Sequence, residues 1–347
     1  MNKVGVFPGK FLPPHRGHLN SIIQSATQCE KLYVVVSDRK QDTYEICEKY
    51  GLRQMPAILR ARWLSQELSN FDHIIVKTLN ESNVPPYPHG TVAWSGLLKE
   101  CIPEPFDVIF GGEEVYRETY MSNFPGVEYK LYDSNRTNWP ISATEIRTNP
   151  VKNWDFILGS ARPHFTKRVL ITGTESCGKT TMTKYLAKIF LTSWAEEYGR
   201  NFADEYLGGN EEVYIEKDFV KIAQKQKDLE EHALRTSNKI TFFDTDAVVT
   251  QFYAKMYLGH EIPELEQYVD PSNYDLVIMM SPNVKWVDDG KRFNEDQSKR
   301  ERLHEELIQM YKNRGFEESK ILRIDENNYN DRLNAALDAS SKLINHK

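Results

Sequence analysis

Two phosphate-binding patterns, one in each half of the chain, most constrain how these 347 residues can fold. The first spans residues 9–18 and the second residues 173–180, and each follows a short apolar run and precedes a helical pattern. The unpaired N–H groups at the start of a helix point outward and favour an anion. Because the two patterns belong to different kinds of phosphate chemistry, they indicate an enzyme that uses ATP twice.

Short apolar runs alternate with helical patterns along the sequence, which predicts an α/β fold with parallel sheets covered by helices on both faces. Strands are expected at 4–7, 32–36, 73–76, 108–110, 127–131, 169–172, 240–243, 276–280 and 321–324. A chain of this length most often makes two domains. Residues 159–167 lack periodicity and contain Gly159 and Pro163. We therefore predict two doubly wound domains, 1–158 and 168–347, joined by a linker at 159–167.

Composition excludes several classes of protein. A net charge of -6 and a pI near 5.9 argue against nucleic-acid binding, which favours basic surfaces. The apolar runs are too short to span a bilayer, and the N-terminus has no signal-peptide pattern. The four cysteines are scattered, which suggests neither a zinc site nor a disulfide framework. Reduced thiols fit a cytoplasmic protein best.

The first loop carries a pair of histidines at a helix entrance, His15 and His18, with Gly17 between them. Imidazole N–H groups can stabilise the charge that develops on phosphate oxygens as pyrophosphate leaves. One such donor is typically worth roughly 3 kcal/mol of barrier. Gly17 allows a nucleotide to approach the backbone closely. Lys10, in the same loop, is a candidate ligand of the acceptor phosphate or of the triphosphate.

A second polar cluster lies near the end of the same predicted domain. Ser142, Thr144 and Arg147 supply two hydroxyls and a guanidinium at another expected helix start. Ser142 and Glu145 also fit a capping box, which is a purely structural explanation of those two residues. Capping does not explain Thr144 or Arg147, so we expect the cluster to bind phosphate as well.

The residues of both clusters resemble the nucleotidylyltransferase superfamily, whose signatures are His-x-Gly-His and Ile-Ser-x-Thr-x-x-Arg. The resemblance implies a Rossmann-like domain in which His15, His18, Ser142, Thr144 and Arg147 bind the phosphates of ATP. It also implies adenylyl transfer to a phosphate acceptor. Further cofactor-binding candidates of this domain are Phe7, Gly9, Phe11, Gly111, Gly112, Glu113, Asp133 and Arg136. The two glycines depart mildly from relatives that have serines at that point.

Trp94 follows the segment 87–90 and presents an aromatic plane. Such a plane could stack on a flat cationic ring such as nicotinamide. The alternative is that Trp94 is an ordinary core aromatic, which the pattern alone favours. Trp94 is therefore a candidate acceptor-site residue with two interpretations open.

The second loop fits the Walker A pattern in full, from Gly173 to Gly178, Lys179 and Thr180. The backbone N–H groups of such a loop wrap the phosphates, the lysine reaches the β and γ oxygens, and the hydroxyl holds Mg²⁺. The remaining nucleotide-binding candidates of this segment are Glu175, Ser176, Cys177 and Thr181. The pattern predicts a P-loop kinase.

An apolar run ending in Asp244-Thr245-Asp246 resembles a Walker B strand. Asp244 would orient Mg²⁺, and Asp246 would bind the acceptor hydroxyls or accept the transferred proton. One of the two could instead be a helix N-cap. Tyr198 and Arg200 are further acceptor-site candidates. Asp204 and Gln226 are candidates as well, although a structural role is favoured for Gln226. The segment 286–292 resembles a kinase lid in which Arg292 closes over the phosphates.

The order of these motifs resembles the bacterial NadR family over essentially the whole chain. That resemblance implies a ribosylnicotinamide kinase and a nicotinamide mononucleotide (NMN) adenylyltransferase. Nicotinamide riboside, NMN and ATP would be the substrates, Mg²⁺ the metal and NAD the product. Some members carry an N-terminal helix-turn-helix; since the first strand is expected within the first few residues, we expect no such domain and no repressor role here. A homo-oligomer is compatible with the sequence.

Two other functions are compatible with parts of this pattern. The enzyme alternative is a pantetheine-phosphate adenylyltransferase fused to dephospho-CoA kinase, which would use the same two folds. Trp94 favours a nicotinamide acceptor over it. The other alternative is a nucleotide-sensing regulator whose sites bind but do not react, against which the intact His15, His18 and Lys179 argue.

Overall fold

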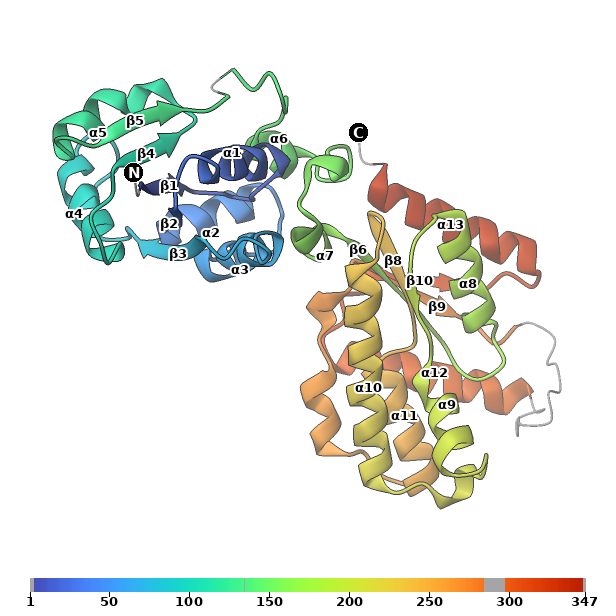
Figure 1. Ribbon diagram of the computed structural model, residues 1–347. Helices are drawn as coiled ribbons and strands as arrows, with labels where there is room; N and C mark the ends of the chain where they lie inside the picture. Colours follow the sequence, from blue (N-terminus) through green and yellow to red (C-terminus); the bar gives the residue numbers. More distant parts are fainter. Residues whose placement is uncertain (1–2, 134, 284–296, 346–347) are drawn as a thin grey trace. The chain divides into compact units, whose positions relative to one another are not determined.

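The computed structural model describes residues 3–133, 135–283 and 297–345 (Figure 1). The chain divides into two compact units, residues 1–165 and 166–347. Each contains a five-stranded sheet in which neighbouring strands are parallel. The predicted fold class, two α/β units with parallel sheets, is confirmed.

The first unit places its strands in the order β3-β2-β1-β4-β5, so the chain starts in the middle of the sheet. The strands are β1 (Val4–Gly9), β2 (Lys31–Asp38), β3 (Ile74–Asn80), β4 (Val108–Gly111) and β5 (Glu128–Leu131). The helices are α1 (Arg16–Ala26), α2 (Lys40–Lys49), α3 (Ala57–Glu67), α4 (Thr91–Cys101), α5 (Arg117–Asn123), α6 (Ala143–Thr148) and α7 (Arg162–Phe165). Short 3-10 turns lie at Glu114–Tyr116, Trp154–Phe156 and Gly159–Ala161.

Strand β2 is apolar on both faces, as a central strand of a parallel sheet must be. Val34 and Val36 face the core beneath α1 and α3, while Tyr33 and Val35 face the core beneath α4 and α5. The two helix layers lie on opposite sides of the sheet in Figure 1. Parallel strands carry their carboxyl ends to one edge, which is where the first loop leaves β1.

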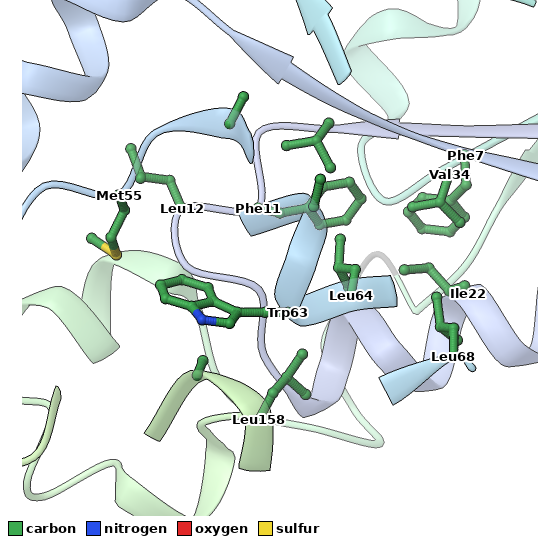
Figure 2. Close-up of a cluster of buried hydrophobic side chains, with 14 of the residues drawn as sticks. Phe7, Phe11, Leu12, Ile22, Val34, Met55, Trp63, Leu64, Leu68 and Leu158 are labelled. Carbon is green, nitrogen blue, oxygen red and sulfur yellow. The ribbon is translucent and has the colours of Figure 1, made fainter. Parts of the chain in front are cut away.

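The first loop is anchored by its own apolar residues. Figure 2 shows Phe11 and Leu12 among the core side chains, with Leu64 and Trp63 of α3 close to them. Only 2% of the Phe11 side chain is exposed, although its backbone has a positive φ of 49°. The loop is therefore held from below by packing, which leaves its polar groups to face outward.

Residues 159–167 were expected to be a linker without regular structure, and the structure differs. They contain a 3-10 turn at Gly159–Ala161, helix α7 and the first residue of the next strand. Ala161 and Phe165 are buried in the core of the first unit. The apolar residues between the breakers explain the difference, because both join this core, where the Phe165 ring lies 6.4 Å from that of Trp63.

The second unit has the strand order β10-β9-β6-β8-β7. Its strands are β6 (Lys167–Thr172), β7 (Trp194–Ala195), β8 (Ile240–Asp244), β9 (Leu276–Met280) and β10 (Ile321–Ile324). Its helices are α8 (Lys179–Ile189), α9 (Tyr198–Tyr206), α10 (Glu216–Arg235), α11 (Ala247–Leu258), α12 (Gln297–Asn313) and α13 (Tyr329–Ile344). Short 3-10 turns lie at Glu211–Val213, Pro263–Tyr268, Pro271–Asn273 and Glu318–Lys320.

Strand β6 lies at the centre of this sheet and separates two cores. Val169 and Ile171 pack with α8 and α13, whereas Leu170 packs with α10, α11 and α12. The two helix groups flank the sheet in Figure 1. The second loop follows β6 and the Asp244-Thr245-Asp246 segment follows its neighbour β8, so both lie at the same edge.

None of the helices in the described ranges combines the length and apolarity that a bilayer crossing requires. The four cysteines all lie in those ranges, and none of them forms a disulfide there. Cys47 and Cys177 are buried.

Candidate active sites

The histidine pair of the first unit forms a compact stack at the start of α1. His15 is the N-cap of the helix, and its Nδ1 accepts a hydrogen bond from the backbone N–H of His18 at 3.4 Å. The two rings stack with their centroids 3.6 Å apart, and the edge of one further ring, Phe11, packs against His18 at 5.0 Å. The predicted pair thus acts as one unit of two parallel imidazoles.

Both imidazoles are neutral at physiological pH. Burial lowers the pKa of His15 to about 3, with a further contribution from the charge of Arg136. Burial, His15 and Arg136 together hold the pKa of His18 well below 6.5. Since Nδ1 of neutral His15 accepts a hydrogen bond, its proton lies on Nε2. His18 Nδ1 is buried without a hydrogen-bond partner among the described residues, which leaves it for a ligand.

The second cluster joins the first loop through Arg147. Its guanidinium donates to the Leu12 carbonyl and, at 2.8 Å, to the Thr144 hydroxyl. The Ser142 hydroxyl caps α6 by accepting a hydrogen bond from the N–H of Glu145 at 3.1 Å. In turn, the Glu145 carboxylate accepts one from the N–H of Ser142 at 2.7 Å. The capping box is therefore present, and the structure also brings the two predicted clusters together.

A fully buried arginine that the sequence analysis missed holds the first loop from the other side. Arg60 lies in the middle of α3, and its guanidinium donates to the carbonyl of Lys10 and, at 3.2 Å, to that of Ser37. It also pairs with the buried Asp38 carboxylate at 2.5 Å. The buried guanidinium thus satisfies a carbonyl group of the loop, so the N–H groups of the loop are left for a ligand.

The glycines of the first loop leave no room for larger side chains. A Cβ on Gly9 would lie 2.8 Å from the Phe11 ring, and one on Gly17 would lie 3.1 Å from His15 Nδ1. The Lys10 side chain is 59% exposed and its Nζ lies 3.7 Å from Asp42. Lys10 is therefore accessible to an anionic group.

Phe7, a predicted cofactor-binding residue, turns its side chain into the core. Its side chain is 5% exposed and belongs to the core, like that of Phe11 (Figure 2). The sequence pattern could not separate the two roles, because an aromatic residue beside a phosphate loop fits either.

Trp94 lies on α4, half-buried, with its ring 5.7 Å from that of Tyr120. Its side chain is hydrogen-bonded to the carboxylate of Glu81, which is itself buried just after β3. Burial raises the pKa of Glu81, and the charges of Lys10 and Arg39 oppose that rise. Trp94 is accordingly part of the core packing and is also fixed in orientation near Lys10.

The glycines after β4 have different surroundings. A Cβ on Gly111 would meet the Tyr129 hydroxyl at 2.4 Å, whereas one on Gly112 would have only the Tyr132 carbonyl oxygen within 4 Å, at 3.9 Å. The side chain of Glu113 is exposed, and its carbonyl accepts from the Tyr129 hydroxyl at 2.7 Å. Gly111 is required by packing, and Gly112 is open to a ligand.

Asp133 and Arg136 form a tight turn after β5. Both have positive φ, 44° and 52°, and the Asp133 carboxylate accepts from the N–H of Thr137 at 2.7 Å. Asp133 is thus occupied in shaping the turn. Arg136 is exposed, and its charge acts on both His15 and His18, which places it beside the histidine stack.

The second loop has the strained backbone of an anion nest. Gly173, Ser176 and Gly178 have φ of 146°, 61° and 89°. A Cβ on Gly173 would lie 2.5 Å from the Met280 carbonyl oxygen, so only glycine fits there. Successive N–H groups in such a conformation surround an anion. Lys179 is buried at the start of α8 and donates to the Thr174 carbonyl at 3.0 Å.

A second fully buried arginine, also missed from the sequence, pins this loop. Arg332 of α13 donates to the carbonyl of Cys177 at 3.1 Å and to that of Ser281 at 2.9 Å. The Cys177 thiol is buried and donates to the Thr174 carbonyl at 3.0 Å, and burial raises its pKa. Cys177 therefore contributes backbone and packing to the loop and has no reactive thiolate.

Thr180 and Asp244 fit a Mg²⁺ site. The Thr180 hydroxyl lies 2.5 Å from Asp244 Oδ2, and Asp244 Oδ1 is buried with no hydrogen-bond partner in the described part of the chain. Burial, reinforced by the charge of Glu197, raises the pKa of Asp244 to about 7. Hydroxyl and carboxylate oxygens are the ligands of this hard cation, which takes others from phosphates and water. Thr181, one residue further on, is exposed.

Asp246 is the N-cap of α11. Its Oδ1 accepts from the N–H groups of Val248 and Val249 at 3.1 and 3.3 Å and from the Tyr311 hydroxyl at 2.6 Å. The N-cap alternative is therefore observed for Asp246. Its carboxylate is fully buried and does not line the cavity described next. The geometry of the cap therefore does not support the predicted role of Asp246 in proton transfer.

An open cavity with about 750 Å³ of space between its walls lies beside the second loop. Of the two predicted acceptor-site residues, Arg200 lines the cavity. Tyr198 does not line it, but its N–H donates to the lining residue Gln226 at 3.0 Å. Its remaining walls are Glu175, Ser176, Lys179, Glu197, Gly199, Glu211, Tyr214, Phe219, Ile222, Gln226, Thr245, Val249, Thr250, Tyr253 and Tyr257. The predicted Arg292 lies outside the described residues, as does the rest of 286–292.

Several cavity residues were missed from the sequence. Tyr253 and Tyr257 are four apart on α11 and could have been found by that spacing. Glu197 follows the two-residue strand β7, whose brevity hid its position at the sheet edge. No sequence pattern indicated Tyr214 or Phe219 as cavity residues. Together they give the cavity aromatic rings interspersed with carboxylates, a surface suited to a flat cationic group.

Comparisons with known proteins agree with this geometry. A family model described as an AAA domain matches residues 168–332. The Trifunctional NAD biosynthesis/regulator protein NadR of Escherichia coli (strain K12) is 34% identical over 334 residues, covering 95% of this chain and 80% of the relative.

Two solved structures are similar throughout. A NadR protein in complex with NR has a TM-score of 0.82 and 27% identity, covering 100% of this chain and 97% of the other. A NadR protein in complex with NAD and AMP-PNP has a TM-score of 0.79 and 26% identity over 98% of this chain and 97% of the other. Since both the sequence and the fold match over nearly the whole length, the chain belongs to the NadR family.

Proposed function

We propose that the chain catalyses two consecutive ATP-dependent reactions. Residues 166–347 phosphorylate nicotinamide riboside to NMN, and residues 1–165 transfer an adenylyl group from a second ATP to NMN, giving NAD and pyrophosphate. Membership of the NadR family supports this pair of reactions over the pantetheine alternative. The NR, NAD and AMP-PNP complexes of NadR proteins support the choice of substrates. We place the enzyme in the cytoplasm, with Mg²⁺ at Asp244.

The observation that carries the proposal is that each unit has its own candidate anion site, built from hydrogen-bond donors. In the first unit these are the neutral histidine stack and Arg147. In the second they are the nest at 173–178 and Lys179. The two sites differ in kind, as adenylyl transfer and phosphoryl transfer require.

In the first unit, the attacking NMN phosphate is already anionic, so no general base is needed. The Nε2–H of His15 and the guanidinium of Arg147 would donate to triphosphate oxygens as pyrophosphate departs. Because the imidazoles are uncharged, they bind through hydrogen bonds. Lys10 and Trp94 are our candidates for the acceptor phosphate and the nicotinamide ring.

In the second unit, the nest would bind the ATP phosphates through backbone N–H groups, and Lys179 would exchange its Thr174 carbonyl for a phosphate oxygen. Thr180 and Asp244 would hold Mg²⁺, which neutralises phosphate charge when bound. The cavity beside the nest would take nicotinamide riboside, with one of its aromatic side chains against the cationic ring.

Two substitutions test the division of labour in the intact chain. His18→Ala should abolish the conversion of NMN to NAD and spare phosphorylation of nicotinamide riboside. Lys179→Ala should do the reverse. Both products are resolved by chromatography after incubation with ATP and Mg²⁺. Loss of both activities in either variant would contradict two independent sites, and turnover of phosphopantetheine in place of NMN would contradict the choice of acceptor.

A further inference from the structure

The cavity of the second unit is lined by carboxylates to which the proposed function gives no chemical role. Three carboxylates line the cavity that reaches Lys179: those of Glu175, Glu197 and Glu211. A hydroxyl that attacks a phosphoryl group has to lose its proton, so one carboxylate in such a cavity is a candidate acceptor. The question is which of them has the right surroundings.

Two of the three have other surroundings. The Glu211 carboxylate accepts a hydrogen bond from the Tyr257 hydroxyl at the exposed side of the cavity. Glu175 belongs to the phosphate loop itself, on the side of the ATP donor. Asp244, the last residue of β8, and Asp246 are not among the residues that line the cavity; Asp244 is bonded to Thr180 and Asp246 caps α11.

Glu197 lies where an acceptor carboxylate should be. It follows β7, which pairs in parallel with β8, so it stands at the same sheet edge as the phosphate loop and Asp244. Its charge acts on Lys179 and on Asp244, which places it near both. Its side chain is half-buried, and no group in the described ranges donates a hydrogen bond to it.

We propose that Glu197 accepts the proton of the attacking 5′-hydroxyl during phosphorylation of the nucleoside, an inference that rests on the proposed kinase function. The hydroxyl oxygen forms a bond to the γ-phosphorus while its proton passes to the Glu197 carboxylate. The bond between the γ-phosphorus and the β–γ bridging oxygen breaks, and ADP leaves with that electron pair. The carboxylic acid then releases its proton to water.

The test compares Glu197→Gln with Glu196→Gln in the full chain. Glu196 is the neighbouring residue, exposed and outside the cavity, so its variant controls for the loss of one charge nearby. We expect Glu197→Gln to lower kcat for nicotinamide riboside phosphorylation by about 100-fold or more, the usual range for general base removal. The affinity for nicotinamide riboside, measured by calorimetry, should change by less than about threefold, because glutamine has the same shape.

Several results would overturn the inference. If Glu197→Gln keeps more than a tenth of the wild-type kcat, Glu197 is not the proton acceptor. A large loss of riboside affinity with kcat retained makes Glu197 a binding residue only. If Asp246→Asn loses kcat while Glu197→Gln keeps it, the acid of the helix cap is the acceptor. Conversion of NMN to NAD by the same preparations shows that the chain is folded. A wild-type protein that fails to phosphorylate the riboside refutes the kinase function itself, which is a separate outcome.

Discussion

Replacing Arg60 with methionine tests whether the first loop is held by a buried ion pair. The guanidinium is fully buried and donates to three carbonyls and to one carboxylate. These acceptors belong to Met55, Lys10, Ser37 and Asp38. Methionine keeps much of the length and apolar volume of the arginine stem, so the packing change is small. What changes is the charge balance in the core.

The expected cost follows from what Arg60→Met leaves behind. Asp38 is 6% exposed and would keep only one hydrogen bond from a side chain, that of the Thr43 hydroxyl at 2.7 Å. Breaking a buried pair by removing one partner typically costs about 3 to 5 kcal/mol. For a unit of this size, that lowers the melting temperature by roughly 6 to 20 °C. Urea unfolding of the full chain, followed by circular dichroism, measures the loss.

Two companion variants separate the charge from the hydrogen bonds. Asp38→Asn in the Arg60→Met background removes the stranded carboxylate and should recover a large part of the stability. Arg332→Met is the matched control in the second unit, because Arg332 is equally buried and donates to the Glu326, Cys177 and Ser281 carbonyls. Among the described residues, no carboxylate pairs with it. Its cost should be smaller than that of Arg60→Met.

The Arg60→Met variant should also affect the activity of the first unit more than that of the second. Because Arg60 fixes the Lys10 carbonyl, Arg60→Met should lower NMN adenylylation, measured below its melting temperature, and leave riboside phosphorylation near the wild-type rate. A loss of stability under about 1 kcal/mol, or no recovery in the double variant, would refute the claim that the buried pair holds the loop.

Further changes have definite expected outcomes. Gly173→Ala should abolish riboside phosphorylation and spare NAD formation, since its Cβ would lie 2.5 Å from the Met280 carbonyl oxygen. Gly96→Ala, in the middle of α4 with open space around it, should raise stability by about 0.5 to 1 kcal/mol in a urea titration. Ser142→Ala should cost about 1 kcal/mol through the lost cap and should also slow NAD formation in an initial-rate assay. Burial raises the pKa of Asp246 to about 6, above its ordinary 3.8. Between these two values the folded chain binds more protons than the unfolded chain, so stability falls as pH rises from about 4 to 6. The melting temperature of Asp246→Asn should fall less over the same pH range.

The parts of the sites that sequence could predict are those with a fixed local spacing. A phosphate loop, a histidine pair or a capping box is defined by residues within a few positions, and all three appear where expected. Ser142 shows the limit, because its spacing from Glu145 predicts a cap whether or not a ligand binds. Helix α11 was not predicted at all, since residues 247–252 are all buried and no polar face there creates a helical period.

Arg60 and Arg332 show why the remaining features were out of reach. An arginine in a helical pattern is normally solvated, and only the folded chain reveals that these two reach carbonyls of Lys10 and Cys177, far away in sequence. Their shared chemistry has a consequence for both sites. A loop that binds phosphate has to turn its N–H groups outward, which turns some of its carbonyls inward, where water cannot reach them. A guanidinium has five donors and no acceptor, so it satisfies those carbonyls without competing for the outward amides. Each phosphate loop therefore depends on a cation beneath it as well as on the anion above it.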